Sequence, residues 1–163
     1  MKVKDVARLA IICALYVGLT YAFSFASYGD IQFRISEILV LLCFYRKDYT
    51  ISLVLGCFLA NLGSPMGMVD VLFGTLATLL SCLCICYFKN LYLCALPPVI
   101  FNGVIVGLEL HYVLDLDFVP SMISVAIGEA AVMVLGVIVF TFLRKNRTFM
   151  KMIDANQNYT FSE

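Results

Sequence analysis

Five polar residues gather between two long hydrophobic runs, in the stretch YGDIQFRISEIL at positions 28–39. They are Asp30, Gln32, Arg34, Ser36 and Glu37. Polar and charged groups are costly in an apolar environment unless they are paired. Carboxylates accept hydrogen bonds, whereas amide and guanidinium groups supply donors. We therefore regard this stretch as a candidate site for holding a polar ligand.

Further acids and amides lie at defined depths of the helices predicted below. Glu37 falls in the outer third of its helix and Asn102 near the midplane. Glu129 lies about ten residues, or roughly 15 Å, into the last helix. Three more polar residues lie at or near outer helix ends: Asn61, Asp70 and Glu109. None of these residues lies deep in the inner half, which predicts a pocket that opens outward.

Structural roles are the alternative interpretation of the same residues. Arg34 and Glu37 are three positions apart and can pair on one helix face. Asp70 can cap the start of its helix, and Asn61 can satisfy backbone groups in the turn that follows it. For Glu129 and Asn102 a purely structural role is the weaker interpretation, because polar and ionisable groups inside a membrane usually mark function.

The composition places these residues in an integral membrane protein. Of the 163 residues, 63% are hydrophobic and only 13% are charged, and the mean hydropathy is +0.98. Soluble domains contain about 25% charged residues. The formal net charge of zero argues against a nucleic-acid partner.

The sequence lacks the motifs of common enzyme classes. It has one histidine and no HExxH, GxSxG, GxGxxG or GxxxxGK[ST] pattern. The seven cysteines lie in apolar runs without a CxxC pair, so we interpret them as small hydrophobic residues. We therefore expect no catalysis, no cofactor and no metal site, and any ATP would be used by another subunit.

Six hydrophobic runs are candidates for membrane spans. Four approach the roughly 20 residues that cross a hydrocarbon core; they are 9–26, 71–88, 91–108 and 119–143. The runs 31–45 and 49–62 would rise only about 20 to 23 Å as α-helices. They are either two short spans or one re-entrant hairpin.

Charge distinguishes these two topologies. With six spans and an inner N-terminus, ten of the eleven basic residues lie inside, as the positive-inside rule requires. A re-entrant hairpin would bury Arg46, Lys47 and Asp48 at about 2.5 to 3.5 kcal/mol each. The sequence therefore predicts an all-α compact bundle of six transmembrane helices over 1–147, with both termini cytoplasmic. The polar tail, 148–163, is expected to be loosely ordered.

Two stretches together resemble a known family. SYGDIQFRISEILVLL at 27–42 and GCFLANLGSPMGMVDVLFGTLATLL at 56–80 are similar to the QueT family of queuosine-precursor transporters. The resemblance extends from about Leu9 to Leu143. It implies the substrate-binding S component of an energy-coupling factor (ECF) transporter, which lacks ATPase activity. Its partners would be a transmembrane T protein and two cytosolic ATPases.

The resemblance also implies contact and ligand residues. A small-residue motif on the first helix, here Ala7, Ala10 and Ala14, would contact the T protein, because small residues let helices approach closely in lipid. The expected ligand is a 7-deazaguanine base such as 7-aminomethyl-7-deazaguanine. One carboxylate would accept two adjacent N–H donors of its guanine-like edge. A second carboxylate would bind the cationic aminomethyl group.

The remaining groups of the ligand need a donor and a flat wall. A donor for the carbonyl is available from Asn61, Asn102, Gln32 or Arg34, and Tyr28, Phe33 and Phe73 are candidates for the wall. The predicted substrate-binding residues are Glu37, Glu129, Asn61, Asp70, Asn102, Arg34, Gln32, Glu109 and Tyr28.

Three alternative functions stay open. The chain could be an S component for another small vitamin or base, with the same architecture and a different pocket. It could be a proton-coupled carrier that works alone, although the sequence has no internal repeat of the kind common in such carriers. A purely structural membrane subunit is the third, and the clustered acids argue against it.

Overall fold

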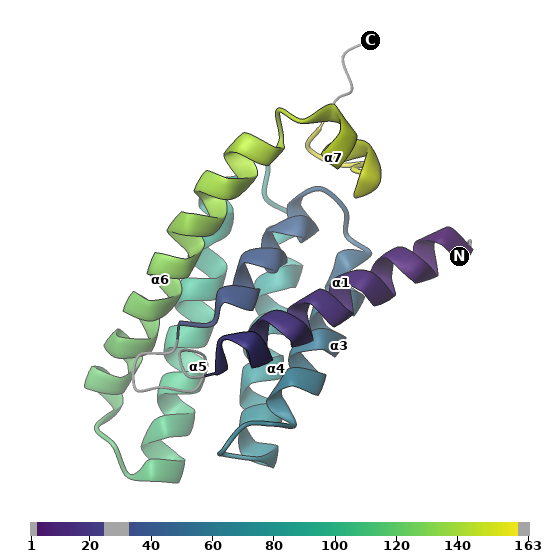
Figure 1. Ribbon diagram of the computed structural model, residues 1–163. Helices are drawn as coiled ribbons and strands as arrows, with labels where there is room; N and C mark the ends of the chain where they lie inside the picture. The colour runs from purple at the N-terminus through teal and green to yellow at the C-terminus, as the bar shows by residue number, and fades with distance from the viewer. Residues whose placement is uncertain (1–2, 25–32, 160–163) are drawn as a thin grey trace.

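The computed structural model describes residues 3–24 and 33–159, and the described residues form helices without strands (Figure 1). In chain order the elements are α1 (Val3–Ala22), the 3-10 helix η1 (Ile35–Phe44), α3 (Tyr49–Asn61), α4 (Met68–Ile85), the short 3-10 helix η2 (Leu93–Ala95), α5 (Leu96–Leu114), α6 (Phe118–Leu143) and α7 (Arg147–Met152).

Four helical segments are long and apolar enough to cross a membrane. They are α1, α4, the segment Leu93–Leu114 that contains α5, and α6. η1 and α3 are the two shorter apolar helices. The prediction of an all-α protein with apolar spans is thus confirmed, whereas the count of six spans stays a prediction.

Two helices extend six residues beyond their hydrophobic runs. α1 begins at Val3, before the apolar run at 9–26, and α5 continues to Leu114, beyond the run at 91–108. A run of apolar residues marks the part that lies in hydrocarbon, and a helix can continue past it into polar surroundings. α5 ends where Asp115 adopts the left-handed conformation, with φ of 53°.

η1 lies at the centre of the bundle. It packs against α1, α3, α4 and α6, and its ten residues rise about 20 Å, because a 3-10 helix rises 2.0 Å per residue. In this geometry residues three apart lie in line. Glu37, Val40 and Cys43 form such a row, and all three are fully buried.

The longer helices around η1 pack against one another in sequence. α1 packs on α3, α3 on α4, α4 on α5, and α5 on α6. α5 and α6 approach closely at Gly107, where an added Cβ would lie 2.8 Å from the Cα of Met122. In Figure 1, α1 crosses the bundle and its N-terminal end projects to one side.

The described part of the C-terminal tail packs against one end of the bundle, contrary to the expectation of loose order. α7 lies beyond the end of α6 (Figure 1), and Met150, Ile153 and Ala155 are buried. The hydroxyl of Tyr49 donates to the carbonyl of Ile153 at 2.7 Å. The tail is polar on average, and its few apolar residues supply the face that packs.

Polar contacts of the tail tie three other segments together. Asn158 Nδ2 donates to the carbonyl oxygens of Phe44 at 2.9 Å and Phe88 at 3.0 Å. Asp154 forms ion pairs with Arg8 of α1 and with Arg46, which follows η1. The tail therefore closes the bundle end at which η1 finishes.

Candidate functional site

A buried polar cluster lies around the start of η1 and draws residues from η1, α3, α4, α5 and α6. Every predicted binding residue within the described ranges has at most 4% of its surface exposed; these residues are Arg34, Glu37, Asn61, Asp70, Asn102, Glu109 and Glu129. Two predicted residues, Tyr28 and Gln32, lie outside the described residues.

Glu37 is held from two directions. Tyr16 of α1 donates its hydroxyl proton to Oε1 of Glu37. Oγ1 of Thr78, in α4, donates to the same oxygen at 3.1 Å. The other carboxylate oxygen, Oε2, has no hydrogen-bond partner among the described residues. Glu37 therefore presents one free acceptor.

Arg34 forms its ion pair with Asp70 and not with Glu37. Nη2 of Arg34 lies 3.7 Å from Oδ2 of Asp70, within ion-pair range but too far for a hydrogen bond. The N-cap of α4 is Gly67, so capping does not account for Asp70. Asp70 instead turns its buried carboxylate into the bundle.

Gly74 leaves the space in which three of these side chains converge. A Cβ at Gly74 would lie 2.6 Å from Nδ2 of Asn61 and 3.3 Å from Oδ1 of Asp70. It would also lie 3.4 Å from Nη1 of Arg34. Real Cβ atoms do not approach a heavy atom to 2.6 Å, so any side chain here would displace Asn61.

The amide of Asn61 is oriented by its own bonds. Nδ2 donates to the backbone carbonyl of Asp70 at 3.0 Å and lies 3.4 Å from Sγ of Cys57. Oδ1 is buried without a partner among the described residues. Asn61 thus offers an acceptor rather than the donor that we expected as one possibility, which leaves Arg34 and Asn102 as the expected donors that the structure describes.

α5 and α6 complete the cluster. Glu109 lies within electrostatic reach of Asp70 and Arg34, and both of its oxygens are unpaired among the described residues. Glu129 lies within electrostatic reach of Glu37 and Arg34, and its Oε1 is unpaired in the same sense. Asn102 lies two turns from Glu109 along α5 with a buried, unpaired Nδ2.

The cluster has many more acceptors than donors. Within the described ranges, twelve buried side-chain polar atoms lack a hydrogen-bond partner, and ten of them belong to the predicted binding residues. Seven of the ten are acceptor oxygens, and only Arg34 Nε, Arg34 Nη2 and Asn102 Nδ2 are donors. Buried polar groups are normally paired. The arrangement suits a ligand that is rich in donors and carries positive charge.

Sequence reasoning missed several contacts of the cluster. Tyr16, Cys57, Gly74 and Thr78 all touch predicted binding residues. The four-residue spacing from Asp70 through Gly74 to Thr78 places all three on one helix face, and it could have indicated the last two. Tyr16 gives no such signal, because it meets Glu37 only through the packing of α1 on η1.

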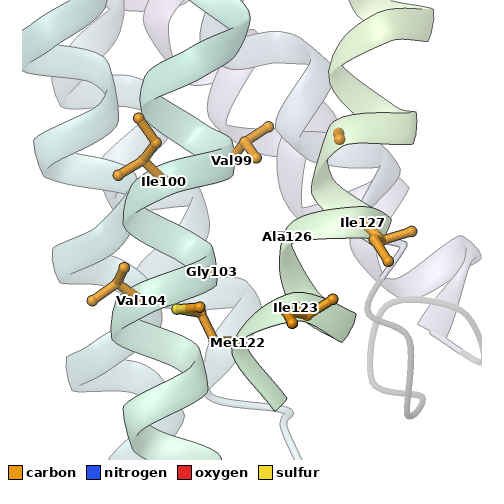
Figure 2. Close-up of a pocket in the computed structure, with 9 residues that line it drawn as sticks. Val99, Ile100, Gly103, Val104, Met122, Ile123, Ala126 and Ile127 are labelled. Carbon is orange, nitrogen blue, oxygen red and sulfur yellow. The ribbon is translucent and has the colours of Figure 1, made fainter. Parts of the chain in front are cut away.

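An apolar groove lies apart from this cluster, between α5 and α6 (Figure 2). Its volume is about 370 Å³, and its lining residues are Val99, Ile100, Gly103, Val104, Met122, Ile123, Ala126, Ile127 and Ala130. Ile100 and Ile127 are more than half exposed, so the groove opens on the surface of the bundle.

α1 presents different faces to the bundle and to its surroundings. Ala7, Ala10 and Ala14, the predicted partner contacts, are all exposed. Tyr16 and Thr20 on the opposite side are fully buried. The small residues are thus available for a close helix contact.

Comparisons with known proteins agree on one family. The model of the QueT transporter family matches residues 6–145. The chain is 35% identical over 160 residues to the queuosine precursor transporter QueT of Lactococcus lactis subsp. cremoris (strain MG1363). That alignment covers 88% of this chain and 94% of the relative. No solved structure matches the chain. The family model and the relative both span most of the sequence, and the chain therefore belongs to the QueT transporter family, a family of multi-pass membrane proteins.

Proposed function

We propose that the chain is the substrate-binding S component of an ECF importer and captures a queuosine precursor, a 7-deazaguanine base, from outside the cell. The observation that carries the proposal is the buried cluster, in which seven acceptor oxygens have no hydrogen-bond partner among the described residues. The name of the Lactococcus lactis relative, a queuosine precursor transporter, supports the same substrate class.

The chemistry of the base matches the cluster group by group. A guanine-like edge offers two adjacent N–H donors, which suit a carboxylate whose two oxygens both lack a hydrogen-bond partner among the described residues, such as Asp70 or Glu109. The aminomethyl arm is a cation, which suits Glu37 or Glu129. Arg34 and Asn102 can donate to the carbonyl of the base.

The rest of the molecule supports a role as a subunit. The exposed Ala10 and Ala14 on α1 fit close contact with a T protein. The chain lacks a nucleotide-binding motif, so two cytosolic ATPases would supply the energy. In this proposal η1 and α3 are short spans, the bundle has six, and both termini are cytoplasmic.

A proton-coupled carrier is the second candidate, and one observation favours it. Four buried carboxylates, Glu37, Asp70, Glu109 and Glu129, share the cluster with one guanidinium group, Arg34. Carboxylates at membrane depth are common in proton relays. Such a carrier would transport its substrate in vesicles under a proton gradient without ATPases, whereas an isolated S component would only bind it.

Ligand binding by the purified chain tests the proposal. The panel contains 7-aminomethyl-7-deazaguanine, 7-cyano-7-deazaguanine, guanine and unrelated vitamins, and the readout is isothermal titration calorimetry. We expect saturable binding of a deazaguanine and no binding of the vitamins. Binding of a vitamin in place of the deazaguanines would identify an S component for another substrate.

A further inference from the structure

The two oxygens of Glu37 have different environments. Oε1 accepts hydrogen bonds from Tyr16 and Thr78, and Oε2 has no partner among the described residues. All three residues are fully buried. We propose that Tyr16 is a positioning residue, which together with Thr78 fixes Glu37 so that a single oxygen, Oε2, receives the substrate. This inference rests on the proposed function, because it assigns the geometry of the same site.

Tyr16 is itself firmly placed between helices. At Gly56 of α3 an added Cβ would lie 3.0 Å from Cβ of Tyr16 and 3.2 Å from the carbonyl of Cys13. The two helices can approach this closely only because Gly56 has no side chain. One turn further along α1, Oγ1 of Thr20 lies 2.7 Å from Oγ of Ser36, the residue before Glu37. α1 therefore contacts the start of η1 at two successive turns.

The proton of Thr78 is directed to Glu37. Oγ1 of Thr78 lies 3.1 Å from Oε1 of Glu37 and 3.2 Å from Sγ of Cys57, but a hydroxyl has one proton to donate. A carboxylate is a stronger acceptor than a thiol sulfur. Cys57 already has a donor, Nδ2 of Asn61 at 3.4 Å. Oε1 of Glu37 therefore receives two donors.

This arrangement determines what Glu37 can bind. An oxygen that already accepts two hydrogen bonds is a poor partner for a third donor, so Glu37 does not suit a pair of adjacent N–H groups. It suits one donor, such as one N–H of an ammonium group. The edge of the base with two donors is then left to Asp70 or Glu109, whose oxygens all lack a hydrogen-bond partner among the described residues.

Removing one hydroxyl group tests the role of Tyr16. Tyr16→Phe keeps the ring and deletes the donor to Oε1. We expect its affinity for 7-aminomethyl-7-deazaguanine, measured by titration calorimetry, to fall at least about tenfold. Tyr45→Phe is the matched control, because the Tyr45 hydroxyl is buried without a partner among the described residues, and Tyr45 stacks on Phe140 at the other end of η1. Its affinity should equal that of the parent.

Infrared spectroscopy separates positioning from packing. The carboxyl stretching band of Glu37 in the ligand-free protein is assigned as the band that disappears in Glu37→Gln. It should shift in Tyr16→Phe and stay unchanged in Tyr45→Phe. An unshifted band in Tyr16→Phe would overturn the inference, even if this variant bound the ligand more weakly. An affinity of Tyr16→Phe equal to that of the parent would also overturn it.

Two further outcomes are also decisive. If Tyr16→Phe loses its helical circular dichroism, Thr78→Val replaces it as the test variant, because it removes the second donor to the same oxygen. A tenfold loss and a shifted band then support the inference, and parent-like values overturn it. If the parent does not bind the deazaguanine, the proposed function fails, and the band shift alone decides whether Tyr16 positions Glu37.

Discussion

At the scale of single residues, the buried carboxylates have too few partners inside the protein. Oδ2 of Asp70 has one cationic partner, Nη2 of Arg34 at 3.7 Å, and Glu109 has no hydrogen bond among the described residues. A buried charge without full pairing costs several kcal/mol. A ligand that supplies donors and positive charge removes this cost. Ligand binding should also raise the free energy of unfolding, by about 2.7 kcal/mol at a ligand concentration of 100 times Kd.

Gly74 gives a direct test of how closely the cluster is packed. Gly74→Ala places a methyl group 2.6 Å from Nδ2 of Asn61, so the amide must move and its bond to the carbonyl of Asp70 is strained. We expect at least about a tenfold loss of affinity for the deazaguanine in titration calorimetry. Gly18→Ala is the control, since apart from the adjoining residues and nearby backbone of its own helix nothing lies within 4 Å of the new methyl group. Equal affinity of both variants would show that the space at Gly74 does not matter.

The sequence identified the cluster members better than their contacts. Rarity of polar groups in apolar runs was sufficient to find Glu37, Asn61 and Glu129. It could not show that the amide of Asn61 faces the backbone of Asp70, or that Tyr16 reaches Glu37 across 21 positions. Such contacts depend on how the helices pack, and a pattern along one helix does not contain that information.

At the scale of elements, the kind of helix was harder to predict than its presence. The residues ISEILVLLCF of η1 are largely apolar, and they are buried or partly buried throughout. An apolar run without a polar face has no period from which an α-helix and a 3-10 helix could be distinguished. For the same reason the sequence predicted an ordinary helix over 31–45, whereas the structure has a 3-10 helix over Ile35–Phe44.

α1 allows substrate binding and partner contact to be separated. Ala10→Leu or Ala14→Leu adds bulk to an exposed face, which should prevent close approach of a T protein. We expect uptake by cells with the complete transporter to fall at least about tenfold, while the isolated chain binds its ligand as before. Ala131→Leu, on an exposed position of α6, is the matched control and should leave uptake unchanged. Loss of binding together with uptake would mean that these alanines support folding.

At the scale of the whole molecule, the described part of the C-terminal tail packs on the bundle, although its composition predicted loose order. Residues 148–163 are mostly polar, which favoured a loosely ordered segment. In the described part, Met150 and Ile153 are buried and Asn158 bonds two backbone carbonyls of other segments. Composition averages over a segment, and two or three well-placed apolar residues are enough to dock it.

Cysteine labelling tests the topology that we propose for the bundle. On a cysteine-free background, a membrane-impermeant thiol reagent should modify a cysteine at position 66 from outside the cell. A cysteine at position 47, in the loop between η1 and α3, should react only after the membrane is opened. The reason is the distribution of basic residues, ten of eleven of which lie on one side in this topology. Labelling of position 47 in intact cells would contradict it.

The buried acids are proposed to bind the substrate, and the affinities of two isosteric variants test this role most directly. Glu37→Gln and Glu129→Gln keep the side-chain size but replace an acceptor oxygen with a donor group. Asp117→Asn, at an exposed acid before α6, is the control. By titration of 7-aminomethyl-7-deazaguanine we expect each cluster variant to lose at least about tenfold in affinity, or about 1.4 kcal/mol, with unchanged helical content. If both variants bind the deazaguanine as tightly as the parent and the control, the acids are structural and the cluster is not the substrate site.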